Sequence, residues 1–70
     1  MTYEMWHLAG KSMIDWFEDR DEALEAVRAY LAADEADVVT LIIRDTSGGI
    51  VMSPTGDALT EWATRLSAAS

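Results

Sequence analysis

The two halves of this sequence correspond at a spacing of 35 residues, and this constrains the fold more than any other feature. The matching positions are Glu22, Ala23, Leu24, Val27 and Leu31 in the first half and Asp57, Ala58, Leu59, Trp62 and Leu66 in the second. Residues three and four apart share one face of a helix, so each half is predicted to contain a helix with a single apolar stripe. Such a stripe needs one surface to cover it, and the residues before each helix must supply that surface.

The residues before each predicted helix have the pattern of a β-hairpin. In the first half we expect strands at Tyr3–Leu8 and Met13–Phe17, joined by a turn in which Gly10 takes a positive φ. In the second half, the β-branched run Val38–Arg44 and the segment Ile50–Ser53 flank a turn that contains Gly-Gly. The sequence therefore predicts an α+β fold, ββαββα, with one four-stranded antiparallel sheet and both helices on one face.

Local signals set the expected ends of the helices. The first helix is expected over Arg20–Ala33 with Asp19 as its N-cap, and the last helix is expected to begin near Thr55, with Thr55 or a near neighbour as its cap. The polar segment Asp34–Asp37 reads as a short link to the next strand. The tail Ser67–Ser70 is expected to fray.

The 70 residues are predicted to form a single domain, 1–70, made of the pseudo-repeat halves 1–35 and 36–70. Half of the residues are hydrophobic, but many of these are alanine. A core of this size typically supplies only about 3 to 5 kcal/mol of net stability. Self-association is therefore an expected source of further burial.

Charge and composition exclude several classes of function. Asp and Glu number 13 against 5 Lys and Arg, and a net charge of -8 repels nucleic acid and anionic membrane surfaces. The chain has no cysteine and one histidine, which removes thiolate and His-cluster metal sites. No apolar run is long enough to span a bilayer, and the first twenty residues carry four acids where a signal peptide needs a basic start and an uncharged stretch, so we predict a cytoplasmic protein. We also predict no cofactor.

The residues and turns just described resemble a group of small uncharacterised acidic proteins of actinobacteria and related bacteria. The resemblance rests on Tyr3-Glu4-Met5-Trp6, Gly10, Met13-Ile14, Phe17, Asp21-Glu22-Ala23-Leu24 and Val27-Arg28, and later on Val39-Thr40-Leu41, Arg44-Asp45 and Gly56-Asp57-Ala58-Leu59. The first turn departs from that group, being a residue shorter and without its Gly-Asn. The resemblance implies the ββαββα fold and no particular activity.

Residues with catalytic or metal-binding chemistry are scarce. His7 is the one histidine, and it has no partner in a recognisable motif. Asp19, Asp21 and Glu22 lack the spacing of a calcium loop and are explained by the start of a helix. We therefore predict no catalytic residue, no metal site and no enzymatic activity.

The strands carry more large apolar side chains than one covered face can bury. Because side chains alternate along a strand, Ile14 and Trp16 face away from the helices if Met13 and Phe17 face toward them. The residues predicted to form an exposed interface are Trp6, Leu8, Ile14, Trp16, Val38 and Ile42. The opposite assignment of the faces, or tryptophans that only shield neighbouring strands, stays open from the sequence.

These observations favour a non-enzymatic protein–protein interaction module that pairs through its sheet, most simply as a homodimer, or with a larger cytosolic protein. The alternative is an acidic regulator or nucleic-acid mimic that binds a basic protein surface through the helix residues Asp21, Glu22 and Glu25. An enzyme or small-ligand binder would require a pocket that joins Trp6 and His7 to an acid.

Overall fold

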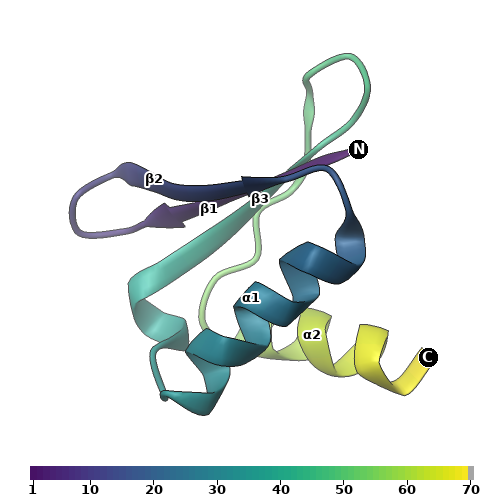
Figure 1. Ribbon diagram of the computed structural model, residues 1–70. Helices are drawn as coiled ribbons and strands as arrows, with labels where there is room; N and C mark the ends of the chain where they lie inside the picture. The colour runs from purple at the N-terminus through teal and green to yellow at the C-terminus, as the bar shows by residue number, and fades with distance from the viewer. Residues whose placement is uncertain (70) are drawn as a thin grey trace.

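A computed structural model describes residues 1–69, in which two helices pack against one side of a four-stranded sheet (Figure 1). The elements in chain order are β1 (Thr2–His7), β2 (Ser12–Phe17), α1 (Arg20–Ala32), the 3-10 turn η1 (Ala36–Val38), β3 (Val39–Arg44), β4 (Ile50–Met52) and α2 (Asp57–Ala69). The predicted α+β fold with ββαββα order is confirmed.

The sheet has the strand order β2-β1-β3-β4, and every neighbouring pair is antiparallel. The first strand of each hairpin therefore lies in the centre and the second lies at an edge. The central pair runs in unbroken register from Thr2 opposite Arg44 to His7 opposite Val39. The pairing of β1 with β2 shifts between Met5 and Trp6, which marks a β-bulge in β2.

The hydrophobic core lies between the sheet and the two helices. Along β3, Val39, Leu41 and Ile43 are buried while the residues between them are partly exposed, so one face of the strand is covered. The full set of buried hydrophobic residues is Tyr3, Met5, Ala23, Leu24, Val27, Val39, Leu41, Ile43, Leu59 and Ala63. These come from both hairpins and both helices, so neither half buries its apolar side chains alone.

The ends of α1 follow known capping rules. The Asp19 carboxylate accepts a hydrogen bond from the backbone N–H of Asp21 at 3.1 Å, which confirms the predicted N-cap. At the other end Asp34 takes the left-handed conformation, with φ 58°, and its N–H donates to the carbonyl of Leu31. The N–H of the next residue donates to the carbonyl of Tyr30, which completes a Schellman motif.

Three local predictions about turns and ends are wrong. The left-handed residue of the first turn is Lys11, with φ 49°, and not Gly10. Val38 belongs to η1, so the third strand begins one residue later than expected. Helix α2 continues through Ala69, so residues 67–69 do not fray, whereas Ser70 lies outside the described residues.

The start of α2 also differs from the prediction. The Thr55 hydroxyl lies 2.7 Å from the hydroxyl of Thr40 on β3, and the two residues form an isolated β-bridge. Thr55 contributes its backbone carbonyl to the N–H of Ala58, at 3.2 Å. Its side chain therefore ties the start of α2 to the sheet and does not cap the helix.

Candidate interaction surface

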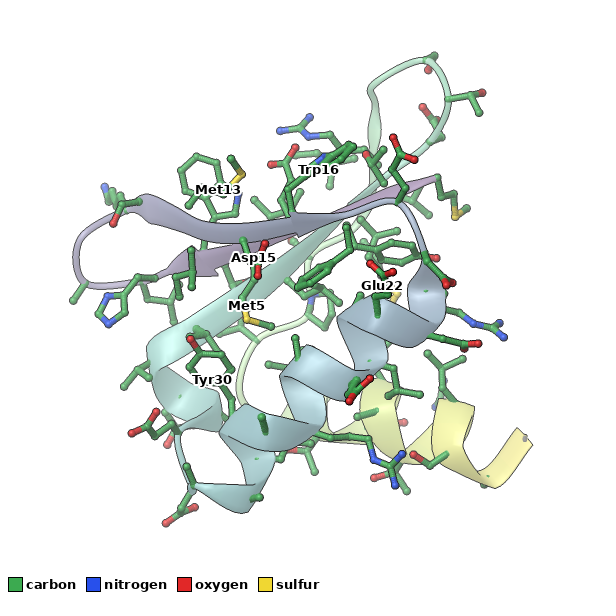
Figure 2. All side chains as sticks on the ribbon, in the orientation of Figure 1. Met5, Met13, Asp15, Trp16, Glu22 and Tyr30 are labelled. Atoms are coloured by element: carbon green, nitrogen blue, oxygen red, sulfur yellow. The ribbon has the colours of Figure 1, made fainter. Side chains whose placement is uncertain are left out.

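The side of the sheet that faces away from α1 and α2 is called the open face here. Pairing places Glu4 and Trp6 of β1 on it, together with Thr40, Ile42 and Arg44 of β3. Its residues are Thr2, Glu4, Trp6, Leu8, Met13, Trp16, Thr40, Ile42, Arg44 and Ile50. Figure 2 shows Met13 and Trp16 above the sheet, on the side opposite Met5 and Tyr30.

Large apolar side chains are exposed on the open face. Trp16 is 46% exposed, Met13 51% and Ile50 58%, whereas the core residues beneath the helices are at most 9% exposed. Trp6 and Ile42, in the middle of the sheet, are half-buried by their neighbours. The open face is therefore a largely apolar surface that no other part of the described chain covers.

The bulge in β2 changes which residues face the helices. Met13 pairs with Trp6 and lies on the open face, so the prediction that Met13 faces the helices is wrong. Asp15 pairs with Met5 and lies on the helix side (Figure 2). Ile14 has no partner in β1 because it is the extra residue of the bulge, and it is exposed. An inserted residue inverts the alternation beyond it, and this is why simple counting failed.

A polar cluster crosses the centre of the open face. Arg44 Nε donates to Glu4 Oε2 at 3.0 Å, and Trp6 Nε1 donates to Glu4 Oε1 at 2.9 Å. Arg44 also donates, through Nη1, to the carbonyl of Gly48 at 2.9 Å. The carboxylate of Glu4 therefore holds both the guanidinium and the indole ring in place, and its own charge is neutralised.

A shallow hollow of about 230 Å³ lies at the end of the open face nearest the first turn. Its lining residues are Trp6, His7, Leu8, Lys11, Thr40 and Ile42. Three of the predicted interface residues, Trp6, Leu8 and Ile42, therefore meet here. The hollow contains Trp6 and His7, and its described lining residues include no carboxylate.

The other predicted interface residues lie apart from this hollow. Trp16 is on the same face, opposite Glu4 and one strand further out. Val38 is exposed in η1, where its carbonyl accepts a hydrogen bond from the N–H of Leu8 at 3.0 Å. Ile14 occupies the bulge at the edge. Met13, Ile50 and the Glu4–Arg44 pair were not predicted as part of this surface. Glu4 is two residues from Trp6 and Arg44 is two residues from Ile42, so alternation along the strands could have found both.

Negative charge is distributed unevenly between the two sides of the molecule. Glu4 is the one acidic residue on the open face, and Arg44 neutralises it. The other twelve of the 13 acids lie on the helices, in the loops or on the helix side of β2. Within residues 1–69, no group of three or more His, Cys, Asp or Glu side chains is arranged to hold a metal ion.

The loop between β3 and β4 is organised around Asp45. Its carboxylate accepts hydrogen bonds from the Ser47 hydroxyl at 2.7 Å and from the backbone N–H groups of Ser47 and Gly49 at 2.9 and 3.0 Å. The Ser47 hydroxyl first, and these backbone donors next, hold the pKa of Asp45 below its ordinary value of 3.8. The loop also carries the Gly48 carbonyl that binds Arg44, so its shape supports the polar cluster.

Comparison with protein-family models, with curated proteins and with solved structures found no match to this chain. The resemblance to small acidic actinobacterial proteins therefore stays a prediction. In the described part of the chain, neither helix has the length and hydropathy needed to cross a bilayer.

Proposed function

We propose that this chain is a non-enzymatic protein–protein interaction module that forms a homodimer through the open face of its sheet. The observation that carries the proposal is the set of large apolar side chains exposed on that face, Trp16, Met13 and Ile50 above all.

The distribution of charge supports a second copy as the partner. Two chains of net charge -8 repel one another when their acidic helix layers approach. The open face avoids this repulsion because its one carboxylate, Glu4, is paired with Arg44. Two copies that meet through their open faces keep their acidic sides pointing outward into solvent.

Sedimentation equilibrium of the parent chain and of Trp16→Ser tests this proposal. We expect a dimer at micromolar concentration, and loss of the Trp16 ring is expected to cost about 2 kcal/mol of association, or about a 30-fold increase in Kd. Ile42→Lys is expected to abolish the dimer, because a lysine ammonium would be buried at the interface. The matched control is Thr64→Lys on the exposed side of α2, which adds the same charge away from the open face.

A parent chain that stays monomeric at high micromolar concentration contradicts the proposal. Fluorescence quenching tests the same proposal independently, through the solvent accessibility of Trp16. Trp16 is expected to be shielded from iodide or acrylamide in the dimer and to become accessible on dilution, whereas quenching as efficient as that of free tryptophan at every concentration would refute burial at an interface.

A second candidate function is an acidic regulator, or nucleic-acid mimic, that binds a basic protein surface. The observation in its favour is the exposed acidic side of α1, with Asp21, Glu22 and Glu25, on the side of the molecule opposite the open face. The dependence of binding on salt concentration distinguishes the two functions. Capture of a basic partner weakens steeply as salt is added, whereas dimerisation through the open face is unchanged or strengthened because the repulsion between two acidic chains is screened.

The proposal includes a cytoplasmic location, which the absence of cysteine supports. Cell fractionation with an antibody against the chain tests it, and recovery in the membrane or secreted fraction would contradict it.

A further inference from the structure

The edge strand β2 exposes the backbone groups on which a second strand could add. It is six residues long, five of them exposed and Phe17 half-buried, and no strand pairs with its outer side in the described chain. The other edge strand, β4, has only three residues. A long and apolar edge strand such as β2 tends to pair with another chain unless a feature of the strand prevents it. The short length of β4 already protects the other edge.

Asp15 stands in the middle of this edge. Its side chain lies on the helix side, opposite Met5, as alternation from Phe17 requires, and it is exposed (Figure 2). Its Oδ1 accepts a hydrogen bond from the backbone N–H of Trp16 at 2.8 Å. A donor of the edge strand is therefore already occupied by a carboxylate of the same chain, and a negative charge lies beside it.

We propose that Asp15 closes the β2 edge to a second copy of this chain and thereby prevents association strand to strand. Two copies that paired antiparallel through β2 in the register centred on Asp15 would bring their Asp15 carboxylates together, and like charges across neighbouring strands destabilise a pair. The incoming chain would also have to displace the carboxylate from the Trp16 N–H. The bulge adds to the barrier, because it bends the strand away from a straight edge.

The inference deepens the proposed function, since it explains why the open face and not the edge is the surface for self-association. The role of Asp15 does not depend on the dimer, however, because it concerns only pairing at the β2 edge. The test is therefore made in the Ile42→Lys background, in which the open face is disabled.

In that background we expect Asp15→Val to self-associate at least about tenfold more tightly than its parent, measured by sedimentation velocity over a range of concentrations. Asp15→Lys is expected to behave like the parent, since a charge of either sign at an edge position prevents strand addition. Glu25→Gln is the control, because it changes the net charge by the same unit as Asp15→Val on an exposed helix position. Circular dichroism and thermal unfolding check that each variant is folded, and Asp15→Thr repeats the test with a smaller gain in hydrophobicity.

Equal masses for Asp15→Val, Asp15→Thr and the parent at every concentration would overturn the inference. It would be overturned equally if Asp15→Lys or Glu25→Gln associated as tightly as Asp15→Val. A monomeric wild-type chain would refute the proposed dimer but not this inference, because the edge test starts from a monomer by design.

Discussion

The two faces of β3 show how differently one strand can be used. On the helix side, Val39, Leu41 and Ile43 are almost completely buried by α1, α2 and the neighbouring strands. On the open side, the residues between them, Thr40, Ile42 and Arg44, are half-exposed. Apolar side chains occur on both sides, so residue type alone does not distinguish the faces.

The difference arises from the number of covering elements. Each half of the chain supplies one helix of 13 residues, and both helices pack on the same side of the sheet because their stripes fit the same core. Nothing in the described chain is left to cover the other side. The covered face therefore supplies the stability of the monomer, and the open face is available for contact with another molecule.

The largest expected effect comes from the covered face. Leu41→Ala removes a side chain that is 0% exposed and leaves a cavity between the sheet and the helices, so we expect a loss of about 2 to 5 kcal/mol in the free energy of unfolding. Urea denaturation followed by tryptophan fluorescence measures it, at a concentration low enough to keep the chain monomeric. If Leu41→Ala lowered the free energy of unfolding by less than Ile42→Ala does in the same conditions, the covered face would not be the one that stabilises the monomer.

The next largest effect is expected at the polar cluster of the open face. Glu4→Ala leaves both the Arg44 guanidinium and the Trp6 N–H without their acceptor, and we expect a loss of about 1 to 2 kcal/mol, reduced by the partial exposure of the ion pair. A double-mutant cycle with Arg44→Met isolates the pair from the Trp6 hydrogen bond. Coupling near zero would mean that the ion pair does not stabilise the sheet.

A smaller effect is expected for the residue next to Leu41. Ile42→Ala removes apolar atoms that are only half-buried, so the monomer should lose about 1 kcal/mol in the same urea experiment. The dimer should be weakened as well, because Ile42 lines the surface proposed for association. An effect on stability without any effect on association would separate the two roles assigned to the open face.

The smallest effect is a pH dependence in the β3–β4 loop. Because the pKa of Asp45 is lower in the folded chain than its ordinary 3.8, its contribution to stability is present above that pH and is lost as the pH falls through the folded value. The difference in unfolding free energy between the parent and Asp45→Asn should therefore be constant near neutrality and shrink below pH 3.8. A difference that stays constant down to acid pH would show that the Asp45 charge does not hold the loop.

Much of the fold follows from local pattern. Alternation in Val38–Arg44 identified the buried face of β3, helical spacing identified both apolar stripes, and the Asp19 cap was found at its observed position. Each of these signals depends on residues that are only a few positions apart in the sequence. The same alternation placed Trp6, Trp16 and Ile42 on the side of the sheet where they are found.

The predictions failed where the outcome depends on contacts between distant residues. Met13 was assigned to the helix side because no local signal marks the bulge, which exists only in the pairing of β2 with β1. Thr55 was expected to cap α2, but its hydroxyl binds Thr40, fifteen residues away along the chain. Residues 67–69 stay helical although a chain end was expected to fray.

The amino-acid order alone determined which segments become helix or strand and which of their sides are apolar, because these depend on intrinsic preferences and short periodicities. Tertiary structure decided the register of β2, the direction of the Met13 side chain and the joining of Glu4 to Arg44 across 40 positions. The physical reason is that the sequence of one strand does not specify which residues of the neighbouring strand it will pair with. Pairing in three dimensions selects that register, and with it the side chains that are left facing outward.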